Sequence, residues 1–228
     1  MNPNRRFKDD IFEQFARIGK AFSSPKRLEL IDILCQGERT VDRLSKETGL
    51  SIANTSQHLQ VLKNARLVEQ EKKGLHVSYR TAPMVCEFFL SFRHVAESRI
   101  TEVDNIKSRF LSGKEGMEPI DRNALIERLK DEQVTLLDVR PAEEFRSGHI
   151  QGALSVPLGE LELMLARLPR DQQIVAYCRG PYCVLSIQAV ELLNQKGFHA
   201  IRLEEGAQDW KALGLSLATG ESNKGTSI

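Results

Sequence analysis

The chain has 228 residues, of which 41% are hydrophobic and 28% charged, and its formal net charge is +1. This composition is typical of a soluble globular protein and excludes a disordered chain. It also excludes a membrane span, because no apolar run approaches the roughly 20 residues that cross a bilayer. Residues 1–6 lack the apolar core of a signal peptide, so we expect a cytoplasmic protein that does not contact membranes.

The charge is divided unevenly along the chain. Residues 1–115 carry 20 Lys and Arg against 15 Asp and Glu, whereas residues 116–228 carry 12 against 16. Residues 111–119 contain two glycines and a proline without an apolar period. These features predict two domains with a boundary after residue 115.

Apolar spacing in the first half predicts a series of short helices. The first helix runs through residues 11–22, the second over 27–35, the third over 40–48 and the fourth over 52–65. The third and fourth are joined by a tight turn at Gly49, which is typical of a helix-turn-helix.

The exposed face of the fourth helix carries short polar and amide side chains, which can reach base edges and phosphates. Two alternating segments, residues 67–71 and 75–80, then predict a hairpin with a cationic tip, so the pattern is that of a winged helix. The candidate DNA contacts are Ser51, Asn54, Thr55, Gln57, His58, Lys63, Lys72, Lys73, His76 and Arg80. The alternative is a protein-binding helix-turn-helix with a solvated lysine turn.

This region resembles the ArsR family of dimeric winged-helix repressors over about 90 residues. The resemblance rests on RLELIDIL from Arg27, SQHLQVL from Ser56, and the pairs Leu67–Val68 and Tyr79–Arg80. It implies a homodimer, formed through the first and fifth helices, that binds double-stranded operator DNA and dissociates when an inducer, often a metal ion, binds.

Several positions depart from the family pattern. Residues 40–42 read Thr-Val-Asp where arsenic-sensing members have cysteines, and the fifth helix, expected over about 83–110, lacks the ligand spacing of zinc-sensing members. We therefore expect no metal site, and the apolar face of this helix suits a dimer partner. Arg66 follows the fourth helix where relatives have glycine; a left-handed backbone there would cost ~1 kcal/mol.

Cys35 and Cys86 each lie among apolar residues, and a reducing cytosol disfavours disulfides. We expect two buried thiols that behave as small hydrophobic residues. A redox or persulfide pair, as in some sulfur-sensing relatives, stays open.

The second half changes to alternating strands and helices. Strands are expected at residues 134–139, 154–156, 174–177 and 199–203, and helices at 123–130, 161–168 and 184–196. This order predicts an α/β domain with a parallel sheet covered by helices on both faces. Ligands of such sheets bind at the carboxyl ends of the strands, where Cys178 lies.

Residues 178–183, the thiol loop, read CRGPYC. The loop amides, the positive end of the following helix and the neighbouring Arg179 favour a nucleophilic thiolate at Cys178, and the same amides can hold a small anion. Pro181 removes one amide donor. Two cysteines are too few for a zinc site, so none is expected.

The second half resembles a rhodanese domain over about 100 residues. The match rests on LLDVRPAEEF from Leu136, GHIQGA from Gly148, the thiol loop, and Gly206 with Trp210. It implies that Cys178 takes a sulfane sulfur from a small donor, such as thiosulfate or a persulfide, without a metal or organic cofactor. The active loop would then be Cys178, Arg179, Gly180, Pro181, Tyr182 and Cys183.

The six-residue loop has sulfurtransferase length, whereas related phosphatase and arsenate-reductase loops are one residue longer. Cys183 is unusual, and two interpretations stay open: it resolves the modified Cys178, or it packs inward at the start of the helix.

The fold class is therefore two-domain, with a mainly α winged helix-turn-helix in residues 1–115 and an α/β rhodanese-like domain in 116–228. The combination predicts a transcriptional repressor that senses or processes reactive sulfur at Cys178. The alternative is a sulfurtransferase whose DNA-binding domain serves localisation or dimerisation, so enzyme activity stays open. A weaker alternative is an arsenic- or metal-linked regulator with a thiol reductase.

Overall fold

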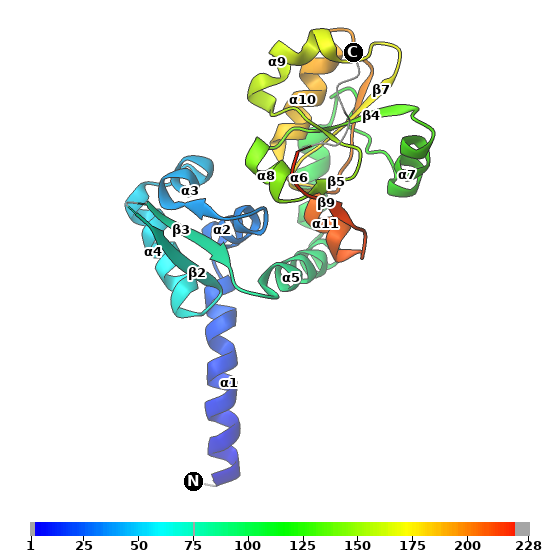
Figure 1. The fold of residues 1–228 in the computed structure, drawn as a ribbon. Helices are drawn as coiled ribbons and strands as arrows, with labels where there is room; N and C mark the ends of the chain where they lie inside the picture. Colours follow the sequence, from blue (N-terminus) through cyan, green and yellow to red (C-terminus); the bar gives the residue numbers. More distant parts are fainter. Residues whose placement is uncertain (1–2, 75, 222–228) are drawn as a thin grey trace. The chain divides into compact units, whose positions relative to one another are not determined.

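The structure is a computed structural model that describes residues 3–74 and 76–221. It divides into two compact units, residues 1–94 and 95–228 (Figure 1). The division falls inside helix α5 (Val85–Arg99), before the domain boundary expected after residue 115. Within the described residues, no helix is long and apolar enough to cross a membrane.

The first unit is a helix-turn-helix followed by a β-hairpin, as expected. Its elements before α5 are α1 (Pro3–Phe22), α2 (Pro25–Cys35), β1 (Arg39–Thr40), α3 (Val41–Thr48), α4 (Ile52–Asn64), β2 (Val68–Lys73) and β3 (His76–Thr81). The turn between α3 and α4 depends on Gly49, which caps α3 in the left-handed conformation (φ 67°). Ser51 then starts α4, because its side chain accepts a hydrogen bond from the Asn54 N–H.

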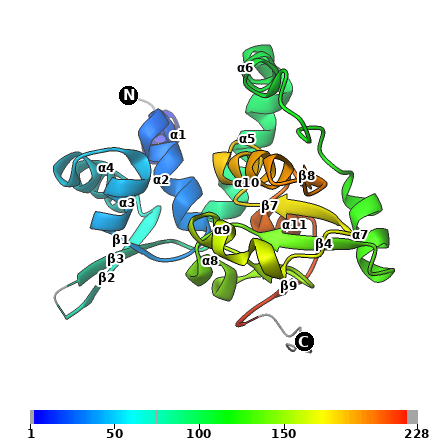
Figure 2. The ribbon, with the colours of Figure 1, turned by 90° about the horizontal axis from the view of Figure 1, so that it is seen from above.

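The strands of this unit form an antiparallel sheet in the order β1-β3-β2. The hairpin of β2 and β3 extends from the helices, as Figure 2 shows. The short strand β1 pairs with β3 through Arg39 and Thr40, a pairing that the sequence analysis does not include. The expected wing therefore has a third strand at its base.

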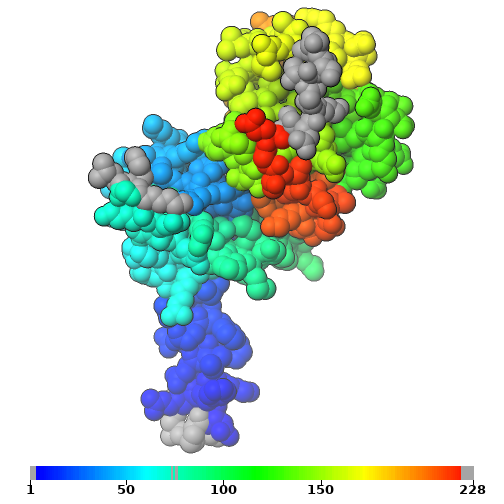
Figure 3. Space-filling view, viewed as in Figure 1, coloured from blue at the N-terminus to red at the C-terminus, as the bar shows by residue number. Residues whose placement is uncertain are grey.

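The core of the first unit is made of apolar side chains from α2, α3 and α4, such as Leu30, Leu44, Leu59 and Leu62, which are fully buried. By contrast, α1 is buried only in its last turn, at Ala21 and Phe22. The rest of α1 is exposed along its length (Figure 3).

Arg66 has a left-handed backbone (φ 60°), as the family comparison suggested. It follows α4 at the position where the Arg66 N–H bonds Lys63 O and the Leu67 N–H bonds Leu62 O, which is a Schellman motif. Arginine therefore occupies a position that glycine adopts without strain.

The long fifth helix, expected over about 83–110, is two helices in the structure. These are α5, which ends at Arg99, and α6 (Thr101–Leu111). Ile100 between them has an extended backbone (φ −112°, ψ 93°). Ile100 and Thr101 are consecutive β-branched residues, whose helix propensity is low, so the interruption has a local cause.

Cys35 and Cys86 form a disulfide, with their Cα atoms 5.6 Å apart. The expectation of two separate buried thiols is therefore wrong, whereas a redox or persulfide role for the pair stays a prediction. The physical reason is packing: Cys35 ends α2 and Cys86 lies in the first turn of α5, which the fold brings together across 51 positions of sequence.

The second unit, after α6, is an α/β domain. Its elements are α7 (Arg122–Lys130), β4 (Val134–Asp138), α8 (Ala142–Ser147), β5 (His149–Ile150), β6 (Leu154–Ser155), η1 (Leu158–Glu160), α9 (Leu161–Met164), η2 (Leu165–Arg167), β7 (Gln173–Tyr177), α10 (Val184–Gln195), β8 (Ala200–Arg202), α11 (Ala207–Ala212) and β9 (Leu217–Ala218). Four strands form a parallel sheet in the order β6-β4-β7-β8, and β5 and β9 form a separate antiparallel pair.

Helices cover both faces of the parallel sheet, as predicted. Alternate residues of β4 and β7 point to opposite faces, so Leu137 and Ala176 pack in the cluster with α9 and α10. Leu136 and Val175 pack in the other cluster, with α7, α8 and α11. The central strand β7 is thus buried on both sides, and its carboxyl end leads directly to Cys178.

Candidate functional site

The thiol loop connects the carboxyl end of β7 to the first residue of α10. Cys178 directly follows Tyr177 and is 1% exposed. Cys183 is the N-cap residue of α10, is half-buried, and makes no side-chain cap hydrogen bond. Cys178 therefore lies, as predicted, between a buried strand and the positive end of a helix, and that helix has 12 residues.

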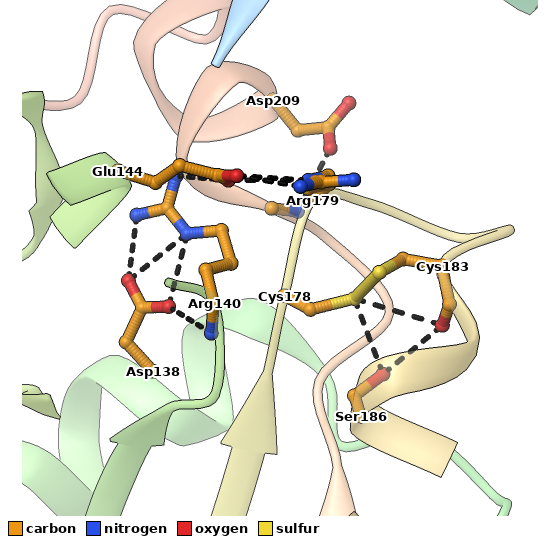
Figure 4. Close-up of a disulfide and its surroundings, with 9 residues drawn as sticks. Asp138, Arg140, Glu144, Cys178, Arg179, Cys183, Ser186 and Asp209 are labelled. Carbon is orange, nitrogen blue, oxygen red and sulfur yellow. Dashed lines mark hydrogen bonds and ion pairs between the residues drawn. A yellow bond between two sulfur atoms is a disulfide. The ribbon is translucent and has the colours of Figure 1, made fainter. Parts of the chain in front are cut away.

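The two cysteines of the loop form a disulfide, with Cα atoms 6.4 Å apart (Figure 4). Ser186, in the first turn of α10 and 1% exposed, lies beside them. Its Oγ is 3.6 Å from Cys178 Sγ and 3.5 Å from Cys183 O. Ser186 is not among the predicted site residues, although its position three residues after the N-cap places it at the same end of the helix.

Arg179 turns away from the sulfur atoms and binds Glu144 of α8, as Figure 4 shows. The Arg179 Nη2 donates to Glu144 Oε1 at 2.6 Å, and Glu144 is completely buried. The Arg179 side chain thus holds the loop backbone in place against α8. No local sequence signal pairs these residues, which lie 35 positions apart.

A buried polar layer lies under the loop. Arg140 donates to Asp138 at 2.6 Å and to Gly148 O at 2.8 Å. Burial alone would lower the pKa of Arg140, but the hydrogen bonds and charge of Asp138 outweigh it and raise that pKa. Burial raises the pKa of Tyr177 well above its ordinary value, so its phenol stays neutral and accepts the Ile150 N–H. These side chains stabilise the fold around the loop.

Gly206 packs directly against the thiol loop. A Cβ on this residue would overlap the backbone carbonyl of Arg179 and lie 2.8 Å from Cys178 O. The absence of a side chain, rather than backbone freedom, is what the position requires, because Gly206 has an ordinary φ of −101°.

Tyr182 is the exposed side chain of the loop, at 49%. Its Oη donates to Glu97 Oε1 at 2.8 Å. Glu97 lies near the carboxyl end of α5, the helix that begins in the first unit. Downstream, Lys107 of α6 binds Glu204 and Lys114 binds Glu191, at 2.5 and 2.6 Å.

The residues predicted to contact DNA are distributed over α4 and the hairpin. Asn54, Gln57, Lys63 and Lys72 are exposed, and His58 is half-buried. Ser51 is exposed and caps α4. Thr55 differs from the expectation: it is completely buried, and its hydroxyl donates to Ser51 O at 2.9 Å. Thr55 lies four and seven residues before Leu59 and Leu62, so helical spacing places it on the apolar face.

Arg80, one of the cationic residues of the hairpin, is paired with an acidic residue. Arg80 binds Glu69 on the neighbouring strand at 2.8 Å, which compensates its charge. The side chains of Lys73 and His76 lie outside what the structure describes. Ile52 is not among the predicted DNA contacts, yet it is 53% exposed directly after the N-cap of α4, and an apolar side chain of this kind can contact a thymine methyl group.

Across residues 3–74 and 76–221, no group of three or more His, Cys, Asp and Glu side chains could hold a metal ion.

A winged helix with an exposed polar helix and an α/β domain with a thiol loop define a DNA-binding regulator joined to a sulfur-transfer domain. Residues 24–70 match the bacterial regulatory proteins of the arsR family, and residues 121–213 match the rhodanese-like domain. The chain is 38% identical over 214 residues to the HTH-type transcriptional regulator Rv0324 of Mycobacterium tuberculosis, with 93% of this chain and 94% of that protein covered. It belongs to the ArsR family of transcriptional regulators and carries a C-terminal rhodanese domain.

Each half also has relatives of its own. A sulfurtransferase of Allochromatium vinosum is 34% identical over 104 residues, which are 45% of this chain and 95% of that protein. The solution structure of a homodimeric winged helix-turn-helix DNA-binding domain from Mycobacterium bovis is 35% identical, with a TM-score of 0.39, and covers 41% of this chain and 87% of that one.

Proposed function

We propose that this regulator is a homodimeric repressor that senses or processes reactive sulfur through a persulfide on Cys178. Sulfur loading of this thiol changes the affinity of the winged helix for operator DNA. The sulfur donor is a small molecule such as thiosulfate or a persulfide.

The surroundings of Cys178 support persulfide chemistry. The thiol lies at the carboxyl end of a buried parallel strand and at the start of α10, whose positive end favours an anion. The six-residue loop is the size that holds a sulfur atom, and the side chain of Arg179 is bound to Glu144. Backbone amides are therefore the main groups that would stabilise a terminal persulfide anion.

The observation that carries the link between sulfur and DNA is the hydrogen bond from Tyr182 to Glu97. Tyr182 precedes Cys183 within the thiol loop, and Glu97 belongs to α5. A change of loop conformation is thereby transmitted to a helix that continues into the DNA-binding unit. Allostery requires such an element, one that can be biased by both sites.

Exposed apolar side chains on the first and fifth helices support a homodimer. Phe12 and Phe15 of α1 are 65% and 64% exposed, and Phe88 and Val95 of α5 are 49% and 62% exposed. Large exposed apolar residues on two helices indicate a surface that a second copy covers. In such a dimer α4 of each copy would enter a major groove, with half-sites about 34 Å or a multiple of it apart.

A binding titration tests the proposal. Reduced protein is titrated against a labelled fragment from the region beside its own gene, by fluorescence anisotropy, before and after incubation with thiosulfate. We expect a change in the apparent Kd of about tenfold, within the usual range for coupled sites. Cys178→Ser should bind DNA and show no response. Both proteins carry Cys35→Ser and Cys86→Ser, so that the second cysteine pair does not contribute.

Intact-mass measurement of the same samples identifies the alternative. If Cys178 gains sulfur while DNA affinity is unchanged, sensing is contradicted and a sulfurtransferase with a localising DNA-binding domain is favoured. If no DNA is bound even at low salt, where phosphate contacts are strongest, operator recognition beside this gene is contradicted.

A further inference from the structure

The second cysteine of the thiol loop is bonded to the first. Cys183 forms a disulfide with Cys178, within a loop that both cysteines terminate. In this state Cys178 cannot accept sulfur, because its Sγ is already bonded and the residue is 1% exposed. Sulfur uptake therefore requires the reduced loop, in which Cys183 is a thiol within bonding reach of Cys178.

Cys183 has the surroundings of a second nucleophile. It is the N-cap residue of α10, where the positive end of the helix favours a thiolate, and its side chain makes no cap hydrogen bond that would hold it away. It is half-buried, so it is more accessible than Cys178. The neighbouring hydroxyl of Ser186, 3.6 Å from Cys178 Sγ, can donate to a thiolate at that atom.

We propose that Cys183 is a resolving thiol and that the loop reduces sulfane sulfur to sulfide. The proposal rests on the persulfide function of Cys178 and adds its product. The Cys183 thiolate attacks Cys178 Sγ of the protonated persulfide, the Cys178–Cys183 bond forms, the bond to the outer sulfur breaks, and HS⁻ leaves with that proton. The two loop thiols supply the two electrons that the sulfane sulfur gains.

Attack of the Cys183 thiolate on the outer sulfur of the persulfide gives the same products. It moves the sulfur to Cys183, and Cys178 then attacks the inner sulfur of that persulfide to give the same disulfide and HS⁻. A trisulfide requires a second sulfane sulfur or an added oxidant, so one equivalent of donor gives the disulfide. An external thiol or dithiol reductant must then reopen the loop for another turnover.

This chemistry converts a short-lived modification into a lasting one. A loop with a single thiol passes its sulfur on and returns to its first state, whereas a loop with two thiols stays oxidised until a reductant acts. Tyr182, which contacts Glu97, lies directly beside Cys183. The disulfide, rather than the persulfide, is then the state that the regulator holds.

A single-turnover experiment with thiosulfate tests the inference. Thiosulfate releases only sulfite when it gives up its outer sulfur, so any sulfide must come from sulfur bound to the protein. The reduced, desalted full chain carries Cys35→Ser and Cys86→Ser. After incubation, sulfide is trapped by alkylation and quantified, and the protein is alkylated and its intact mass measured.

We expect one sulfide per chain and loss of both loop thiols to alkylation, with no retained sulfur. Cys183→Ser should keep one added sulfur atom and release no sulfide until a thiol reductant is added. Serine is a preferred N-cap residue, so this variant should fold, which circular dichroism checks. Cys183→Ala gives a second comparison, and Cys178→Ser should neither gain sulfur nor release sulfide.

Two outcomes distinguish the resolving role of Cys183 from the persulfide function of Cys178 on which it rests. If the chain with both loop cysteines retains its sulfur and Cys183 stays open to alkylation, the resolving role is overturned while the persulfide proposal stands. If Cys183→Ser gains no sulfur either, the persulfide proposal fails and the resolving role fails with it.

Discussion

Reduction of the Cys35–Cys86 disulfide should lower the stability of the winged-helix unit by about 4 kcal/mol at 25 °C. The bond closes a segment with a sequence separation of 51, and the chain-entropy relation gives this value for a loop of that length. The segment includes α3, α4 and the hairpin, so the crosslink restricts most of the unit in the unfolded state.

Urea unfolding followed by circular dichroism at 222 nm, a wavelength at which helices dominate the signal, measures the effect. The chain carries Cys178→Ser and Cys183→Ser, which leaves one disulfide, and its concentration is held constant because dimer formation shifts the midpoint. With a slope of about 2 kcal/mol per molar urea, the oxidised and reduced forms should differ by about 2 M in midpoint. The matched control adds Cys35→Ser and Cys86→Ser and should show no redox dependence. An oxidised and a reduced form with the same midpoint would refute the reasoning.

Three further changes have defined outcomes. Gly206→Ala should displace the backbone of Arg179 and Cys178 and abolish sulfur uptake from thiosulfate, with circular dichroism unchanged; normal uptake would contradict the close packing. Arg66→Gly should raise the free energy of unfolding by about 1 kcal/mol in urea titration, because the position is left-handed; a destabilised variant would argue against strain there. Tyr182→Phe should release sulfide from thiosulfate normally but lose the DNA response, as sulfide trapping and anisotropy together measure; an intact response would exclude its hydrogen bond as the link.

Local signals explain what the sequence predicts well. The turn at Gly49 and the cap at Ser51 are set by neighbouring residues, so helices α3 and α4 are visible in the pattern. The same holds for the buried strand β7 and for Cys178 immediately after it. Period, caps and turn residues require no knowledge of distant contacts.

Side chains that depend on distant contacts are not predictable in this way. The pairing of Glu144 with Arg179 requires α8 to lie beside the loop, which no pattern in either segment indicates. The Cys35–Cys86 bond is of the same kind, since composition alone favours two isolated thiols. Thr55 is different, because its spacing from Leu59 already places it on the buried face of α4. It was predicted to contact DNA because its side chain is polar, although its helical spacing indicates burial.

Both cysteine pairs are connected to α5, one directly and one through a neighbouring residue. Cys86 joins α2 to the first turn of α5, and Glu97 near the other end of α5 accepts the hydrogen bond of Tyr182 beside Cys183. A general thiol oxidant closes both pairs, whereas thiosulfate adds sulfur only where a thiolate is held for it. A DNA response to oxidant alone therefore does not identify the sensing site. A response to thiosulfate that persists in the chain without Cys35 and Cys86 would assign sulfur sensing to the thiol loop.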